Sequence, residues 1–365
     1  MSTPRIVGVV GCGVTGSRIA AHLAAEGCRV ALFDQQSHVA TAVARRTGGV
    51  TVERVADLEV SDAVVVTTPA PHLRLVGSLI AAGTTVVTVG DDLHDVEAML
   101  GLQAQALAAG VPVVVGAGMA PGLSGLLARH LASQLHTVDE LHVATHGTAG
   151  PACAYQHHQA LGSRAVFWHD FEWQESPGGS GRDLVWFPEP VEAHDCYRAA
   201  LPDPLLLQRA FPSVARISAR VSATRRDRLT ARLPMLTPPH PSGDLGAVRV
   251  EARGASESGE RLTVIAGASG ATADLAAAVC AATTLQVLAH GREAVGGGVW
   301  SPADHAVAGL EVLHHATRLG VRVQEFWRCS RQQLVISPRG VCSPFERAHR
   351  AVAAGRPHGV AARPG

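Results

Sequence analysis

The chain of 365 residues is long enough for two domains, and 47% hydrophobic with 17% charged residues indicates a well-buried globular protein. Its 31 acidic and 31 basic residues cancel, which gives no electrostatic footprint for nucleic acid or an anionic membrane. No apolar run reaches the ~20 residues that a membrane span needs. A strand predicted within a few residues of Met1 leaves no room for a signal peptide. Seven scattered cysteines without C-x-x-C spacing fit a reducing compartment, so we expect a cytoplasmic protein.

The sequence contains no lysine, so all 31 basic residues are arginines. A Schiff-base lysine, a P-loop lysine and a lysine general acid are therefore excluded. Any proton transfer must use His, Asp, Glu, Tyr, Cys or water.

Short Val-rich runs alternate with helical segments over the first 115 residues. Continuous apolar strands joined by helices are typical of a doubly wound parallel sheet covered on both faces. The predicted strands are 5–10, 29–33, 50–53, 63–67, 84–89 and 111–115, with helices near 15–26, 37–47, 71–82 and 92–109.

The pattern changes at Pro121, where a Pro-Gly step precedes a helix near 122–135. Alternating segments follow and read as strands with one face on a core. They lie at 216–224, 248–252 and 262–266, before helices near 270–290 and 303–319 and a strand at 321–326. We expect an α/β protein: a Rossmann-type domain over 1–120, an α+β substrate domain with a mixed or antiparallel sheet over 121–290, a segment over 291–328 that returns to the first domain, and a disordered tail over 329–365.

A G-x-G-x-x-G pattern follows the first predicted strand and opens a helix, as a dinucleotide-binding turn requires. Its glycines allow the tight turn, the approach of a pyrophosphate and close helix packing. Asp34 closes the second strand, where a carboxylate binds ribose hydroxyls and favours NAD over NADP. Arg45 and Arg46 keep NADP open. The pattern consists of Gly11, Cys12, Gly13, Val14, Thr15 and Gly16.

Polar residues follow the next strands at the carboxyl edge of the predicted sheet, which lines the dinucleotide crevice. We assign Thr67, Thr68, Pro69 and Asp91 to cofactor binding and Asp92 to acid/base chemistry.

Three features resemble the saccharopine dehydrogenase-like family, which includes saccharopine reductases and lysine 6-dehydrogenase. They are the glycine pattern with Asp34, the segment 115–123 (VGAGMAPGL) and the segment 298–304 (GVWSPAD). The resemblance implies a Rossmann domain, a dimer formed through the α+β domain, and hydride transfer at a carbon bonded to nitrogen in an amino-acid-like small molecule. It places Gly116 and Met119 beside the cofactor. Relatives that act on diamino acids often carry an acid where Met119-Ala120 stands, so a cationic group need not be held there.

Histidines concentrate in the middle of the chain and are natural acid/base groups where lysine is missing. His146 precedes a loop of small residues, and Tyr155, His157 and His158 follow that loop. We assign Tyr155 to substrate binding. We take the three histidines as catalytic candidates, with histidines held by backbone hydrogen bonds as the alternative. His142, His146, His157 and His158 lack the spacing of a metal-binding helix, so we expect no metal.

The remaining candidates are substrate-binding, each with a structural alternative. The helix start at Pro121-Gly122 offers amides for a carboxylate, or is a simple cap. Trp168 belongs to a pocket wall or to a core hairpin. Arg225 clamps a carboxylate, or belongs to a solvated charged run.

The sequence predicts an NAD(P)-dependent oxidoreductase that acts on a C–N bond of an amino-acid-like substrate. A dehydrogenase of an alcohol or aldehyde, and a non-catalytic NAD-binding protein, are the alternatives.

Overall fold

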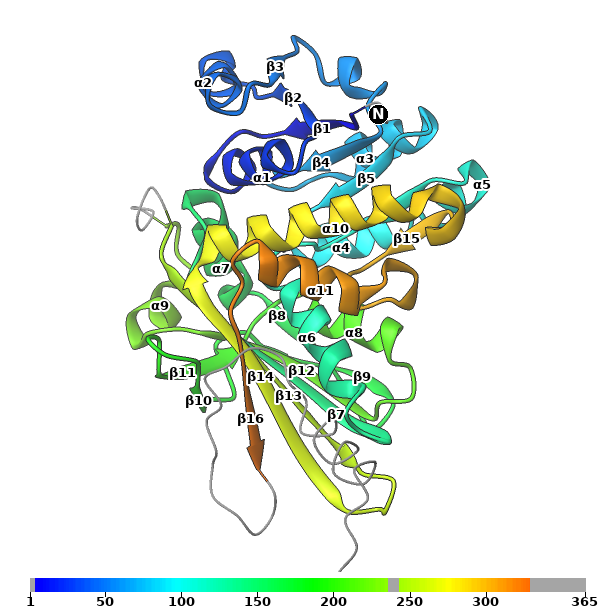
Figure 1. Ribbon diagram of the computed structural model, residues 1–365. Helices are drawn as coiled ribbons and strands as arrows, with labels where there is room; N and C mark the ends of the chain where they lie inside the picture. The colour runs from blue at the N-terminus through cyan, green and yellow to red at the C-terminus, as the bar shows by residue number, and fades with distance from the viewer. Residues whose placement is uncertain (1–3, 236–242, 329–365) are drawn as a thin grey trace, which may run out of the picture.

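The computed structural model describes residues 4–235 and 243–328 and contains two β-sheets with helices packed between and around them (Figure 1). The first sheet contains seven strands, all parallel, in the order β15-β6-β5-β4-β1-β2-β3. Its strands are β1 (Ile6–Val10), β2 (Arg29–Phe33), β3 (Val50–Thr51), β4 (Ala63–Val66), β5 (Thr85–Thr88), β6 (Pro112–Val114) and β15 (Gly298–Trp300).

Helices connect these strands and cover the sheet. They are α1 (Val14–Ala25), α2 (Ser37–Thr47), the 3₁₀ turn η1 (Val55–Leu58), α3 (Leu73–Ala81), α4 (Leu93–Leu100) and α5 (Gln103–Ala109). All four residues of β4 are buried, because a parallel sheet with helices on both faces hides both sides of its central strands. The predicted Rossmann fold is confirmed, although the helix expected over 92–109 is broken after Leu100 into α4 and α5.

The second sheet is mixed, with the order β10-β11-β12-β7-β13-β14-β16, and β8 pairs with both β12 and β9. Strand β12 runs parallel to β7, and its other neighbours are antiparallel. Ile217, Ala219 and Val221 alternate with half-buried polar residues, which confirms a strand with one core face. The strands are β7 (Thr137–His146), β8 (Arg164–His169), β9 (Glu172–Pro177), β10 (Asp183–Trp186), β11 (Ala193–Arg198), β12 (Arg216–Ser222), β13 (Leu245–Ala255), β14 (Arg261–Ala271) and β16 (Val323–Arg328).

Helix α10 (Thr272–Val295) lies between the two sheets, where it packs against α1 and against strands of both (Figure 1). It has the length and hydropathy of a membrane span, but 78% of its apolar window is buried, as in the core helix of a soluble protein. The other helices are α6 (Leu123–Ala132), α7 (Pro151–Gly162), α8 (Asp203–Ala210), α9 (Arg225–Thr230), the 3₁₀ turn η2 (His305–Val307) and α11 (Gly309–Arg318).

The segment expected to return to the first domain is divided between the two sheets. Strand β15 pairs with β6 of the first sheet, whereas β16 pairs with β14 of the second. The tail expected over 329–365 lies outside the described residues.

Candidate active site

The glycine turn between β1 and α1 has the geometry that the sequence pattern predicts. Gly11 has a φ of +92°, a conformation that favours glycine. A Cβ on Gly16 would lie 1.9 Å from the Gly11 carbonyl oxygen, whereas a Cβ on Gly13 would meet nothing within 4 Å. The hydroxyl of Thr67 donates to the Gly11 carbonyl at 2.6 Å and braces the turn. Gly16 therefore serves packing, and Gly13 leaves open space above the backbone.

Asp34 faces this turn from the end of β2. Its carboxylate accepts hydrogen bonds from the amides of Cys12, at 2.7 Å, and Gln36, at 2.8 Å. Burial and the neighbouring Asp34 charge raise the pKa of the Cys12 thiol to about 12, so this buried cysteine is an inert part of the turn.

A cleft of about 950 Å³ runs from the glycine turn to α7. Most of the predicted cofactor residues line it: Gly11, Gly13, Val14, Thr15, Gly16, Asp34, Thr67, Thr68, Pro69, Asp91 and Met119. Cys12 and Gly116 do not. Gly116 instead has a φ of +68°, and a Cβ there would lie 2.7 Å from the Pro121 ring.

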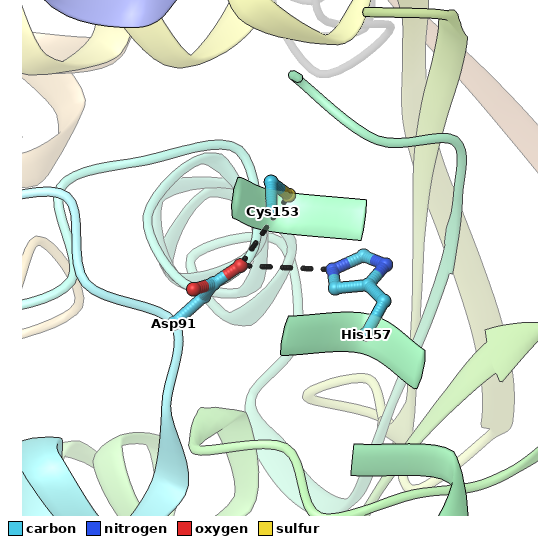
Figure 2. A group of neighbouring side chains, drawn as sticks. All are labelled: Asp91, Cys153 and His157. Carbon is cyan, nitrogen blue, oxygen red and sulfur yellow. Dashed lines mark hydrogen bonds and ion pairs between the residues drawn. The ribbon is translucent and has the colours of Figure 1, made fainter. Parts of the chain in front are cut away.

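Three reactive side chains meet in the lining of the cleft (Figure 2). Asp91 follows β5, while Cys153 and His157 lie four residues apart on one face of α7. The Cys153 thiol donates to Asp91 Oδ2 at 3.5 Å, and His157 Nε2 lies 3.7 Å from the same oxygen. The Asp91 and His157 side chains are 24% and 14% exposed. The carboxylate is thus shared between a thiol and an imidazole.

Burial favours the uncharged form of all three groups. It raises the pKa of Asp91, against the opposing effects of His157 and Cys153, and it lowers the pKa of His157, against the opposing charge of Asp91. Burial and the Asp91 charge raise the pKa of the Cys153 thiol well above its ordinary value. The acid and the imidazole are moved toward each other in pKa, which suits proton exchange between them.

The same three polar atoms lie within 4.8 Å of one another and form the one group in the described part of the chain with the spacing of a metal site. The four histidines weighed as metal ligands from the sequence are held apart by other partners. His142 contacts Ser218 and Glu140, His146 contacts Ser222, and His158 contacts the Leu233 carbonyl.

Two of the predicted acid/base histidines point away from the cleft. His146 hydrogen-bonds Ser222 on the second sheet and stacks on His194 with ring centroids 4.1 Å apart. His158 Nε2 donates to the Leu233 carbonyl at 2.8 Å, which is the backbone-held alternative. Asp92 lines the cleft but has structural partners, because it caps α4 through the Asp95 amide and accepts from Gln156 Nε2 at 2.5 Å.

The predicted substrate residues are scattered. The first amides of α6 are occupied, since Leu123 donates to the Gly118 carbonyl and Ser124 to that of Met119; Pro121 and Gly122 shape this turn outside the cleft lining. The Trp168 indole donates to the Val214 carbonyl and packs edge-on against Trp173. Arg225 is exposed at the start of α9, and Tyr155 lines a hollow beside the cleft.

A buried His72–Asp95 pair in the cleft wall was not predicted. His72 Nδ1 lies 2.5 Å from Asp95 Oδ2, and Nε2 donates to the Thr68 carbonyl at 2.8 Å. Burial opposes the charged ring, but Asp95 and this carbonyl outweigh it, so the pKa of His72 is raised and that of Asp95 is lowered. Both ring nitrogens face acceptors, which favours the protonated ring, and the pair holds the loop after β4 in place. The sequence around these two residues carries no signal for the pair.

Residues 9–61 match the family model of an NAD(P)-binding Rossmann-like domain. No curated protein matches the sequence.

The structure is similar to that of saccharopine dehydrogenase (L-Glu forming) from Saccharomyces cerevisiae, with a TM-score of 0.68 and 16% identity over 89% of this chain and 100% of that chain. At this identity the likeness establishes a saccharopine dehydrogenase-like fold, which confirms the resemblance seen in the sequence at the level of the fold.

Two further solved structures are less similar. A dehydrogenase from Clostridium difficile has a TM-score of 0.45 and 11% identity over 87% of this chain and 98% of that chain. UDP-N-acetylglucosamine 3-dehydrogenase from Acidithiobacillus ferrooxidans has a TM-score of 0.44 and 14% identity over 87% and 97% of the two chains. Likenesses at these scores carry no argument about this chain.

Proposed function

We propose that this chain is an NAD(P)-dependent oxidoreductase that transfers hydride to or from a carbon bonded to nitrogen. The observation that carries the proposal is one cleft lined by both the glycine turn and the half-buried Asp91–His157 pair. A cofactor turn and a proton-transfer pair in one cleft are the two parts that a dehydrogenase needs.

The start of α1 fits a dinucleotide. The helix has no side-chain cap at Gly13 and no acidic residue in its first turn, so its first amides and dipole are not neutralised by the protein. A pyrophosphate over the open face of Gly13 would bind there. Asp34 would hold the ribose hydroxyls, and because Arg45 and Arg46 are exposed on the last turn of α2 and absent from the cleft lining, we propose NAD as the preferred cofactor.

Proton transfer in the cleft is assigned to Asp91 and His157. Bound NAD supplies the hydride acceptor for the oxidation of an amine. Oxidation also releases one proton from the nitrogen, which His157 is placed to accept because burial lowers the pKa of its ring and so favours the neutral form. Asp91 faces the ring and stabilises the imidazolium that forms.

Binding of NADH to the purified chain is the first test, followed by its fluorescence. We expect micromolar affinity for NADH and weaker binding of NADPH. A panel of amines, amino acids, hydroxy acids and aldehydes, followed at the NADH absorbance, then assigns the bond. Absence of NADH binding would remove the redox proposal, and turnover of hydroxy acids alone would replace C–N chemistry with alcohol oxidation.

We further propose a homodimer and a reducing, cytoplasmic location. Five cysteines in the described part of the chain are unpaired, as in a reducing compartment. Light scattering on the purified chain tests the dimer, and a mass of one chain at micromolar concentration would refute it.

A further inference from the structure

A second hollow, of about 760 Å³, opens off the cleft between the first domain and α7. Its walls come from the loop after β4, from the first turns of α3 and α4, and from one face of α7. Asp92 and Gln156 line both spaces, so the hollow begins beside the Asp91–His157 pair. The residues shared by the two linings are Pro69, Ala70, Pro71, Asp92, Pro151, Ala152 and Gln156.

The walls of the hollow are mainly apolar. Pro71, Leu73 and Ala98 face Tyr155 and Met235, and the Tyr155 side chain is exposed. The polar groups at the base are already paired, because Asp95 binds His72 and Asp92 binds Gln156. The hollow therefore suits an alkyl or aryl group rather than a second polar end.

The lining of these spaces is acidic and offers no free basic group. Three carboxyl groups line the cleft at Asp34, Asp91 and Asp92, and among the described residues that line the cleft or the hollow there is no arginine. The His72 ring in the cleft wall is already bound by Asp95 and by the Thr68 carbonyl. Arginine is the only side chain of this protein with a permanent positive charge, since lysine is absent. A substrate carboxylate beside Asp91 would be repelled without a compensating cation, whereas a substrate ammonium would gain a charge-assisted hydrogen bond.

We infer that the substrate is an amine, or the matching imine, with an apolar group and no carboxylate next to the nitrogen. This inference rests on the proposed function and replaces the amino-acid-like substrate that the family resemblance implies. The ammonium lies against Asp91 and the apolar group fills the hollow. The alkylammonium ion would give one proton to His157, the freed electron pair would form the C=N bond, and the hydrogen on carbon would leave with its electrons to bound NAD⁺, so that one alkylammonium ion and NAD⁺ become one iminium ion, NADH and a proton.

Matched ligand pairs that differ by one carboxylate test the inference. Phenethylamine is compared with phenylalanine, and 3-methylbutylamine with leucine, by calorimetric titration into the protein–NADH complex. We expect each amine to bind at least about 100-fold more tightly than its amino acid, as removal of an uncompensated like charge requires. Equal or tighter binding of the amino acids, or binding of neither member of a pair, would overturn the inference.

The same titration separates this inference from the proposed function. If NADH itself does not bind, the oxidoreductase proposal fails, and the pairs are compared on the cofactor-free protein by thermal shift. Stabilisation by the amines alone would still support the amine site, and stabilisation by the amino acids or by neither would refute it.

Variants test the two parts of the site separately. Asp91→Asn should weaken the binding of the amines at least about 10-fold, measured with NADH at a saturating concentration. The matched control is Glu257→Gln, an acid-to-amide change at an exposed position between β13 and β14, outside both linings; it should leave the affinities for the amines and for NADH unchanged.

Gln159→Arg supplies the missing cation on an exposed position of the hollow. It should shift the preference toward the amino acids by about 10-fold. Because this change lies on the surface of α7, it keeps the inference falsifiable if Asp91→Asn fails to fold, and an unchanged preference would count against the site.

Discussion

Two parts of the cleft lining, the glycine turn and the Asp91–Cys153–His157 cluster, contribute in different ways. At the start of α1 the backbone contributes, because glycines bring free amides and open space to the surface. On α7 the side chains of Cys153 and His157 contribute, and they meet Asp91, which follows β5 and lies 62 residues from Cys153 in the sequence. The glycine turn is complete within one stretch of chain, whereas the cluster exists only where α7 packs beside the loop after β5.

This difference has consequences for substitution. A backbone site fails when a Cβ fills space, and a side-chain site fails when a functional group is removed. Four changes, taken from the largest expected effect to the smallest, test whether the glycine turn and the Asp91–Cys153–His157 cluster act independently.

The largest effect should come from Gly16→Ala. Its Cβ would meet the Gly11 carbonyl oxygen at 1.9 Å, so the helix start must move, and we expect loss of NADH binding by more than about 100-fold together with a lower melting temperature. Gly13→Ala has room in the protein, so it should weaken NADH while leaving stability unchanged. The measurements are NADH fluorescence titration and thermal unfolding.

Gly77→Ala is the matched control, because this glycine lies within α3 and a Cβ there would meet nothing within 4 Å. It should be neutral or stabilise the protein by up to about 1 kcal/mol. If Gly13→Ala leaves NADH affinity unchanged, no pyrophosphate lies over that residue.

The next effect concerns the imidazole of His157. His157→Gln should lower kcat/KM by about 100-fold with NADH affinity unchanged, because a base is lost and the glycine turn is not touched. Burial lowers the pKa of His157 below its ordinary 6.5, so the wild-type enzyme should keep its activity down to that pH and lose it only in more acid solution. In His157→Gln, the rate should no longer fall over this acid range of pH.

His158→Gln is the comparison that the sequence alone could not decide. Its ring contacts the Leu233 carbonyl, so turnover and the pH profile should stay as in the wild type. A loss of turnover in His158→Gln that matches the loss in His157→Gln would refute the orientation of α7 toward the cleft.

The glycine turn and the Asp91–Cys153–His157 cluster also differ in how far the sequence predicts them. Periodic Val-rich runs and glycine spacing are local, so the Rossmann fold, the turn and Asp34 could be located before the structure was known. The rotation of α7 about its axis is set by its packing against α9 and β8 and by its side-chain contacts with Asp91 and Asp92. Neighbouring positions such as His157 and His158 point about 100° apart on a helix, and nothing local chooses between them.

Packing also decides the features that the sequence misses. Cys153 has no motif around it, and it becomes part of the site only because Asp91 lies opposite. Likewise α10 reads as a helix of the second domain, yet it packs on α1 because its apolar surface extends around most of the helix. The mixed sheet could be predicted as a class, and its strand order could not.

A third effect concerns the stability that the protein loses by burying the carboxyl group of Asp203. Asp203 is 1% exposed, and burial, with a contribution from Asp91, raises its pKa from 3.8 to about 6 against the opposing hydrogen bond from Ser124. Because the folded pKa lies above the unfolded one, its contribution to stability is greatest below pH 3.8 and is lost as pH rises through about 6.

The expected loss is about 3 kcal/mol over this pH range, at 1.36 kcal/mol for each pKa unit. Asp203→Asn should therefore gain stability relative to the wild type as the pH rises from 4 to 8, measured by urea unfolding at several pH values. A constant difference between the two proteins over that range would show that the carboxyl group does not titrate in the folded state.

The smallest effect should be on the choice between NADH and NADPH at the glycine turn. Asp34→Asn keeps an oxygen that accepts from the Cys12 amide but removes the charge beside the ribose, so NADPH affinity should rise by about 10-fold and NADH affinity should fall slightly. Asp34→Ala removes the acceptor as well, and both cofactors should bind more weakly because the turn loses its brace. If Asp34→Asn leaves the ratio of NADH to NADPH affinity unchanged, this carboxylate braces the turn without selecting the cofactor. Another residue of the cleft would then decide the preference between NADH and NADPH.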